Sequence, residues 1–369
     1  MNNTKAGSYG KLIAFFLVAV IVLCAFGFAV EGWQIQDNTS TGKPDSDIVN
    51  GNINSPSDNN SQDQAPETEA PRPPQYTDSI TGLEISAEDA LVRHLAFSID
   101  PDAPLYGISD TQLMLEIPIE NDKTRYLVFT RNSKSIGKIG SIAPTREYIS
   151  SLVKAFNSVL ISNGADNSAK YPSSDIVNMH FDLSKNAGYS YTEYSKYTYS
   201  NGELINAGIS NLGISSKVTT PLNAPYTFTE FFADEVKGAI PAQSVTLPYS
   251  TQTLISYSSA NKTYVLSKNG SSKMDTLSDA PLEFKNVFVL FADSITYEDE
   301  NGIETVINTG GGGKGIYMTN STAKNITWMS DSSGNLSFLD ENGHVLTVNR
   351  GTSYIGFVKS ARLADVKFS

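Results

Sequence analysis

Residues 113–130 read LMLEIPIENDKTRYLVFT, two apolar runs separated by a polar tetrapeptide at 120–123. Runs of this length, rich in branched and aromatic residues and joined by a polar turn, predict paired strands. We therefore expect strands over 113–119 and 125–130. Another short apolar run, at 95–99, is a third strand candidate in the same region.

Helical patterns surround these strands. Ser86 and Asp89 are spaced as in a capped helical turn, and Pro144 opens a stretch with apolar residues at helical spacing that ends at Gly164. After a strand candidate at 176–181, Thr227 and Glu230 have capping-box spacing and predict a second helix over 227–237. The mixture predicts an α/β domain over residues 79–243.

The pattern changes after Gln243. Short apolar runs alternate with turn signals, which predicts a β-rich domain over residues 244–369 and an α+β protein overall. The turn signals are Asn269-Gly270, Asn301-Gly302, Ser333-Gly334 and Asn342-Gly343. The strand candidates are 253–258, 287–291, 305–308, 326–329, 336–339, 345–348 and 354–358.

An unbroken apolar run extends from residue 12 to residue 30, preceded by Lys5 and Lys11 and followed by acidic residues. As a helix, these 19 residues rise about 28 Å, close to the ~30 Å hydrocarbon core of a bilayer. The run predicts a single transmembrane helix over 12–30, with 1–11 cytoplasmic and the remainder extracytoplasmic at the cell membrane.

Two alternatives to a spanning helix remain open. A cleaved signal peptide has a shorter apolar core, and the small-x-small sites at 25–27 and 27–29 lie inside the run. A lipoprotein signal would lipidate Cys24, but Leu23 before it is not small. We interpret Cys24 as an apolar membrane residue, which leaves the exported part without a disulfide or a thiol nucleophile.

Residues 31–78 predict a disordered acidic linker. Asn, Ser, Asp, Gln and Pro dominate the stretch, and its scattered apolar residues cannot bury enough surface to offset the entropy of ordering. We interpret it as a spacer between the membrane and the folded part.

Charge and motifs exclude several classes of function. The chain has 39 acidic and 27 basic residues and no Lys/Arg cluster, so no nucleic-acid partner is expected. The histidines His94, His180 and His344 show no metal-ligand spacing, and we predict no metal and no cofactor. The glycine run 310–315 fails the phosphate-loop spacing because Gly315 follows the lysine; it predicts a loop between strands that can approach a ligand.

Tyrosines are concentrated between residues 189 and 199. Tyr189, Tyr191, Tyr197 and Tyr199 have odd spacing, which would place them on one face of a strand. An aromatic face can stack on sugars, but packing against neighbouring strands is the commoner reason for such a pattern.

Several short motifs along the chain are distinctive when taken together. They are 81–84 (TGLE), 107–109 (GIS), 124–125 (TR), 138–140 (KIG), Arg146, 226–227 (YT), 285–287 (KNV), the glycine loop, Trp328 and 351–355 (GTSYI). In these motifs the chain resembles the YerB-like lipoproteins, the family of domain of unknown function 3048. The resemblance implies bacterial envelope proteins with a mixed α/β domain and a β-rich C-terminal domain, anchored by lipid and without an established activity.

The departures from that pattern concern arginine and histidine, which bind anions or move protons near neutral pH. The family's Arg-Pro is Ala103-Pro104 here, an arginine is replaced by Ala143, a histidine by Ser162, and a His-Asn by Asn223-Ala224. A polar site of the family would therefore be altered or absent in this chain.

These observations favour a membrane-anchored binding or scaffold module of the cell envelope, with a cell-wall polymer or an envelope protein as partner. The alternatives are a cell-wall or glycan hydrolase with a site between the two domains, and a degenerate paralogue with a structural role. Whether any catalysis occurs stays open, with the balance against an enzyme. The candidate ligand-binding residues are Asp100, Glu116, Arg125, Arg146, Tyr226 and Gly312.

Overall fold

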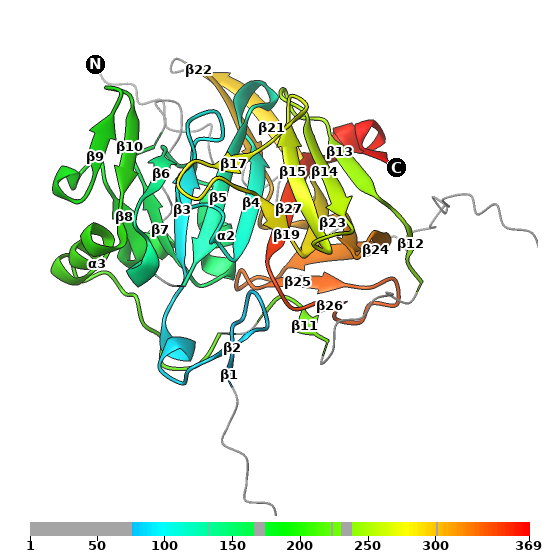
Figure 1. The fold of residues 1–369 in the computed structure, drawn as a ribbon, viewed down its shortest axis with the longest axis horizontal. Helices are drawn as coiled ribbons and strands as arrows, with labels where there is room; N and C mark the ends of the chain where they lie inside the picture. Colours follow the sequence, from blue (N-terminus) through cyan, green and yellow to red (C-terminus); the bar gives the residue numbers. More distant parts are fainter. Residues whose placement is uncertain (1–75, 132, 166–173, 223, 230–237, 300–301) are drawn as a thin grey trace, which may run out of the picture. The chain divides into compact units, whose positions relative to one another are not determined.

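The computed structural model describes residues 76–369 except 132, 166–173, 223, 230–237 and 300–301 (Figure 1). The predicted cytoplasmic segment, the apolar run and residues 31–75 of the predicted linker lie outside the described residues. Residues 76–78, which the sequence assigns to the linker, belong to the folded part, because Tyr76 pairs with Ile85 and Thr77 pairs with Glu84. Within the described part, no helix is both long and apolar enough to cross a bilayer.

Strands dominate the described residues, and a 14-stranded sheet forms the centre of the fold. Its order is β12-β24-β23-β20-β27-β4-β5-β3-β6-β10-β9, with β25 beside β24, β7 beside β3, and β8 beside β7. The strands are β3 (Leu95–Ile99), β4 (Leu113–Pro118), β5 (Thr124–Thr130), β6 (Ile139–Ile142), β7 (Val159–Ser162), β8 (His180–Asp182), β9 (Tyr191–Glu193), β10 (Tyr197–Ser200), β12 (Ile240–Pro241), β20 (Asn286–Ala292), β23 (Gly312–Thr319), β24 (Thr322–Ser330), β25 (Leu336–Leu339) and β27 (Ser353–Lys359).

Strands from both sides of Gln243 share this sheet. β27 lies between β20 and β4 and is parallel to both, with Ile355 opposite Leu115 and Phe288. β4, β20 and all of β27 but its last residue are buried, as expected for strands covered on both faces. The two predicted domains are therefore continuous through one sheet.

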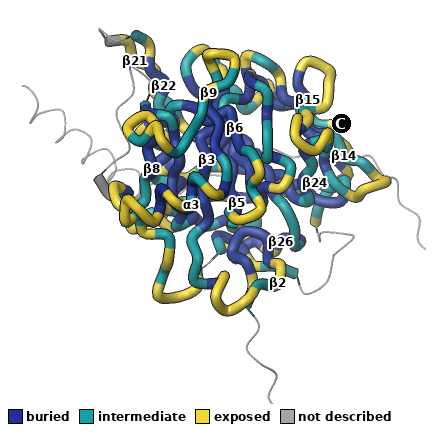
Figure 2. Tube along the Cα trace, turned by 60° about the vertical axis from the view of Figure 1, so that its left-hand side comes forward, coloured by how far each residue is buried: buried dark blue, intermediate teal, exposed yellow. Residues whose placement is uncertain are grey.

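A second sheet covers one face of the central sheet. Its strands are β13 (Ser244–Leu247), β14 (Thr253–Ser258), β15 (Thr263–Lys268), β16 (Ser271–Ser272), β19 (Glu283–Phe284) and β28 (Lys367–Phe368). Leu247, Ile255 and Leu266 share one apolar core with Met114 and Val128. Figure 2 shows the central strands buried beneath their surroundings.

The opposite face packs against helix α2 (Ile149–Ala155), whose Leu152 and Val153 share a second core with Leu115 and Leu127. Helix α3 (Gly202–Asn211) lies beside β8, where Gly208 contacts the Phe181 ring. The short elements are 3-10 helices η1 (Asp89–Leu91), η2 (Glu120–Asp122), η3 (Ser133–Ser135), η4 (Ser174–Met179), η5 (Ala187–Tyr189) and η6 (Ser360–Asp365), and strand pairs β1 (Tyr76–Thr77) with β2 (Glu84–Ile85), β11 (Thr227–Phe228) with β26 (Thr347–Val348), β17 (Met274–Asp275) with β18 (Ala280–Pro281), and β21 (Ser294–Asp299) with β22 (Gly302–Ile307).

The long helix expected over 144–164 is wrong in length. Helix α2 ends at Ala155, and Asn157 adopts a left-handed φ of 45° that turns the chain into β7. Val159 and Leu160 belong to this buried strand, where they pair with Leu95 and Ala96 of β3. Val159 and Leu160 continue the apolar spacing of the helix only because the buried strand follows α2 so closely.

The helix expected over 227–237 is wrong at its start, where Thr227 and Phe228 form β11 parallel to β26. Residues 230–237 lie outside the described part. The tyrosine run is a hairpin rather than one strand, because Tyr194 and Ser195 adopt left-handed φ values of 54° and 52°. Its last tyrosine, Tyr199, is buried, and its ring packs edge-on against Tyr106.

Candidate functional site

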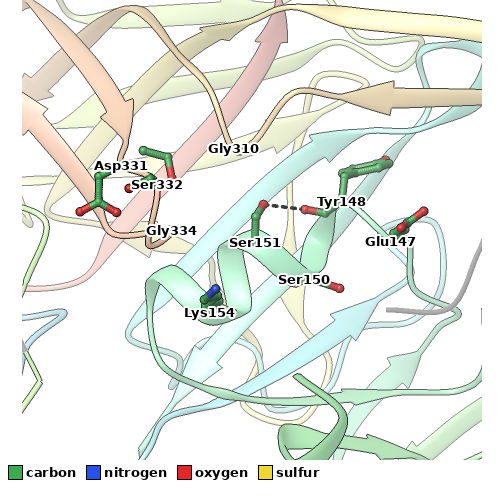
Figure 3. Close-up of a pocket in the computed structure, with 10 residues that line it drawn as sticks. Glu147, Tyr148, Ser150, Ser151, Lys154, Gly310, Asp331, Ser332 and Gly334 are labelled. Atoms are coloured by element: carbon green, nitrogen blue, oxygen red, sulfur yellow. Dashed lines mark hydrogen bonds between the residues drawn. The ribbon is translucent and has the colours of Figure 1, made fainter. Parts of the chain in front are cut away.

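A polar pocket of about 280 Å³ opens beside helix α2 (Figure 3). One wall is the helix and the residues before it, and the other is formed by Gly310 and the turn between β24 and β25. Its lining residues therefore come from both sides of Gln243. They are Glu147, Tyr148, Ser150, Ser151, Lys154, Gly310, Ser330, Asp331, Ser332 and Gly334.

The helical repeat gives the pocket its polar wall. Leu152 and Val153 are buried against the sheet, so Glu147, Ser151 and Lys154, which are spaced three and four apart, lie on the outer side. Ser151 Oγ donates to the Tyr148 carbonyl at 2.9 Å, which anchors this hydroxyl at the start of the helix (Figure 3).

Thr309 attaches the glycine loop to the same helix. Its Oγ1 donates to the Tyr148 carbonyl at 2.7 Å and lies 2.5 Å from Ser151 Oγ. This bond places the next residue, Gly310, at the pocket. Gly312 begins β23 instead, where a Cβ would lie 2.8 Å from the Trp328 carbonyl oxygen.

The opposite wall is a turn organised by Asp331. Its Oδ1 accepts from the backbone N–H groups of Ser333 at 2.8 Å and Asn335 at 2.9 Å, and its Oδ2 accepts from the Asn335 amide at 2.8 Å. The Asn335 side-chain bond is the main cause that holds the pKa of Asp331 below its usual value. Gly334 has a left-handed φ of 85°, and its Cα faces the Lys154 stem.

Behind the pocket, Arg146 is buried in an ion pair with Glu120. Its Nη2 lies 2.5 Å from Glu120 Oε2 and its Nε lies 3.2 Å from Oε1. Burial alone would raise the pKa of Glu120, but the Arg146 hydrogen bond and charge and weaker backbone bonds outweigh it, so the pKa is lowered. The neighbouring Tyr148 is also buried, which raises its pKa. The Arg146–Glu120 ion pair lies next to the pocket lining, but neither residue lines the pocket.

Arg125 belongs to the same region. It is buried, which lowers its pKa, while the charge of Asp100 raises it and that of Arg146 lowers it. Three of the six candidate residues, Asp100, Arg125 and Arg146, therefore lie near enough for their charges to influence one another.

Glu116 lies on the other face of the central sheet. Glu116 pairs with Tyr126 in the β4–β5 register, whereas Arg125 pairs with Ile117 one position away, so the side chains of Glu116 and Arg125 point to opposite faces. The Glu116 carboxylate is fully buried and lies 2.6 Å from Lys268 Nζ. Its other partners are hydroxyls: Tyr354 at 2.6 Å, Thr124 at 2.7 Å, and Thr253 at 3.0 and 3.1 Å.

Tyr226 lies in the aromatic core. Its ring stacks on Phe288 at a centroid distance of 5.7 Å, and its hydroxyl donates to the Ile80 carbonyl at 2.9 Å. Tyr226 and Gly312 thus hold the fold and lie apart from the pocket lining. The six candidate residues do not form one site.

Two histidines are engaged in the interior. His94 Nε2 lies 2.9 Å from Asp78 Oδ2, which also accepts from Arg131 Nε at 2.7 Å, and both His94 and Asp78 are fully buried. His180 Nε2 lies 2.9 Å from Oγ of Ser162, which is also fully buried. Among the described residues, no group of three or more acidic, histidine or cysteine side chains could hold a metal ion.

Sequence reasoning missed most of the pocket. Glu147, Ser151 and Lys154 carry a detectable signal, because they lie opposite the apolar stripe of a helix whose existence was predicted. Asp331 adjoins the predicted Ser333-Gly334 turn. The sequence does not indicate that this turn, nearly 180 residues further along the chain, lies beside the helix.

The fold is thus a β-rich architecture in which one continuous sheet joins an N-terminal and a C-terminal part. The chain belongs to the DUF3048 family of proteins of unknown function: the model of its N-terminal domain matches residues 80–215, and that of its C-terminal domain matches residues 245–355.

The crystal structure of YerB from Bacillus subtilis has the same fold, with a TM-score of 0.67 and 18% sequence identity over 80% of this chain and 99% of that one. Among curated protein sequences, none matches this chain.

Proposed function

We propose that this protein is a membrane-anchored, extracytoplasmic binding module of the cell envelope, and that its pocket takes a hydroxyl-rich saccharide segment of a cell-wall polymer. The apolar run 12–30 and the linker composition of 31–75 support the anchor and the spacer. The pocket supports the ligand class.

The observation that carries the proposal is the lining of the pocket. Four serines, Ser150, Ser151, Ser330 and Ser332, line it together with two acidic residues and one lysine. Hydroxyls both donate and accept, and carboxylates accept, so the wall complements a ligand that carries many hydroxyl groups. A volume of about 280 Å³ accommodates a sugar unit or two rather than a large cofactor.

Burial of the other ionisable clusters supports binding over catalysis. Glu116 is saturated by Lys268 and three hydroxyls, and the His94–Asp78 pair is closed to solvent. A general acid or base must reach a substrate proton within hydrogen-bond distance. These groups stabilise the fold instead.

The test is binding of the full chain, held in detergent micelles, to soluble cell-wall fragments prepared by enzymatic digestion. We expect saturable binding that Ser332→Trp abolishes, because the indole fills the mouth of the pocket. Ser271→Trp, an equally large change at an exposed residue of β16, should leave binding intact. Equal binding by both variants, or no binding by the wild type, would refute the proposal.

A glycan hydrolase is the second candidate, because Glu147 and Asp331 place two carboxylates on opposite walls of one pocket. Incubation of the full chain with purified sacculi, followed by chromatography of the soluble products, distinguishes the two functions. Release of fragments that is lost on Glu147→Gln would establish hydrolysis; binding without release supports the module.

A further inference from the structure

Strand β21 forms the outer edge of a two-stranded ribbon. Among the described strands it pairs with β22 alone, in an uninterrupted register from Ser294 opposite Ile307 to Asp299 opposite Gly302. β22 attaches the ribbon to the body, because Ile307 is buried and the Thr305 N–H donates to Glu120 Oε1 at 3.4 Å. The other side of β21 therefore faces no described strand, and the ribbon lies at the margin of the molecule (Figure 2).

The exposed apolar side chains of β21 belong to residue types that favour strands. Ile295 is 60% exposed and Tyr297 is 38% exposed, and their spacing of two places them on the same face of the ribbon. Natural edge strands are usually protected by charged side chains, especially lysine, by proline or by a bulge. Residues 294–299 (SITYED) contain no lysine or proline, the register shows no bulge, and the charged residues, Glu298 and Asp299, are confined to one end of the strand. Such an edge can accept an added strand.

The sequence of this edge is complementary to itself. In an antiparallel pair with a two-fold axis at Thr296, Ile295 lies opposite the partner's Tyr297, and Tyr297 lies opposite the partner's Ile295. Both are aromatic–branched cross-strand pairs, which are among the favourable ones. An axis at Ile295 or at Tyr297 would instead place one of these apolar side chains opposite Asp293 or Asp299. The axis at Thr296 thus matches all four apolar side chains and leaves the like-charged positions, Asp293 opposite the partner's Asp299, at the two ends of the pair.

We propose that two copies of this chain associate through antiparallel pairing of their β21 strands, centred on Thr296. A single strand pair buries little surface, so the dimer is weak in dilute solution. Asp293 and Asp299 face each other at both ends of the pair and Glu298 lies beside them, so moderate salt strengthens the contact by screening the repulsion. If the chain is anchored as proposed above, confinement to a membrane raises the effective concentration of the second copy.

Disulfide trapping tests the register. In a Cys24→Ser background, Thr296→Cys is the only cysteine of the full chain. At the two-fold axis the two Cα atoms would be about 4.5–5.5 Å apart, within the disulfide range. Glu298→Cys is the matched control, because it lies on the same face of the ribbon two residues further along. Its two copies would be four residues out of register, about 14 Å apart.

We expect mild oxidation of the full chain in detergent micelles to give at least tenfold more covalent dimer with Thr296→Cys than with Glu298→Cys. The double variant Ser294→Cys/Glu298→Cys should also crosslink, because these two positions face each other in the proposed register. Equal crosslinking of Thr296→Cys and Glu298→Cys, or none in either, would overturn the proposal.

Sedimentation of the full chain supplies an independent measurement. Ile295→Lys should raise the dimer dissociation constant at least tenfold, whereas Ile303→Lys, also exposed but on β22 and on the opposite face, should not. Circular dichroism checks that both variants fold. Ser332→Trp in the pocket should leave dimerisation unchanged, so failure of saccharide binding and failure of dimerisation are distinguishable. A wild type that stays monomeric up to about 1 mM would overturn the proposal.

Discussion

Replacement of Lys268 by methionine should destabilise the protein by about 3–5 kcal/mol, because it leaves the carboxylate of Glu116 buried without its counter-charge. Glu116 is fully buried, Lys268 is 8% exposed, and Nζ lies 2.6 Å from Oε1. Methionine fills much of the lysine stem's volume, so the loss reports the charge rather than a cavity. The pair joins β4 to β15, the strands on either side of the interface between the two sheets.

The hydroxyl partners of Glu116 set the magnitude within this range. Tyr354, Thr124 and Thr253 still donate to the carboxylate in the variant, so the cost should lie near the lower limit, about 3 kcal/mol. With an unfolding entropy of about 2.1 cal/mol/K per residue over roughly 300 residues, this cost lowers Tm by about 5 °C. Removing both charges, in Glu116→Gln/Lys268→Met, should restore at least about 1.5 kcal/mol relative to additivity.

The measurement is guanidinium unfolding of the full chain in mild detergent, followed by fluorescence of the fully buried Trp328. Lys217→Met is the matched control, because Lys217 is exposed and its loss should cost less than about 0.5 kcal/mol. A cost below about 1 kcal/mol for Lys268→Met, or strict additivity in the double variant, would refute the reasoning that this is a buried, coupled ion pair.

Three further predictions concern stability. Asp275→Asn should cost about 2–4 kcal/mol in the same unfolding assay, because its carboxylate accepts from the backbones of Gly107, Ile108, Ser109 and Leu277, and an amide would turn N–H groups toward N–H donors. Burial would raise the pKa of Asp275, but these bonds outweigh it and lower the pKa. The free energy that the ionised Asp275 contributes to folding is therefore present above the unfolded pKa of about 3.9 and is lost as pH falls through the lower folded value. A stability difference between wild type and Asp275→Asn that did not shrink with acid would contradict this. Asn201→Ala should lower the free energy of unfolding by about 1 kcal/mol and reduce hydrogen-exchange protection in α3, because Asn201 Oδ1 accepts from the Leu204 N–H at 2.9 Å. Asn211→Ala, at the other end of the helix, is the control.

Much of the strand pattern follows from local sequence. The expected strands at 253–258 and 336–339 coincide with β14 and β25, because alternation and flanking turns are local signals. The 113–130 hairpin also forms as expected, with Leu115 opposite Leu127. Asn201-Gly202 shows the limit of such signals: the dipeptide is typical of a hairpin turn, but an asparagine before glycine also suits a helix cap, and here it begins α3.

The candidate site could not be predicted to the same extent. Glu116 and Arg125 are close in the hairpin, but the register places their side chains on opposite faces, and the register depends on the turn at 120–122. The pocket joins residues 147–154 to 330–334, and a single sequence contains no information on that pairing. Local patterns identified the helix and the turn separately.

The distribution of ionisable groups bears on binding against catalysis. Two pairs have the hydrogen-bond distances that general-base chemistry would use: His94 with Asp78, and His180 with Ser162. However, Asp78, His94 and Ser162 are fully buried. Burial lowers the pKa of both histidines, which favours neutral rings held inside the fold. The exposed carboxylates, Glu147 and Asp331, instead line a pocket rich in hydroxyls, and Asp331 is already committed to its own turn. A group that organises a turn accepts ligand hydroxyls without having to change its protonation, so this arrangement favours recognition over bond cleavage.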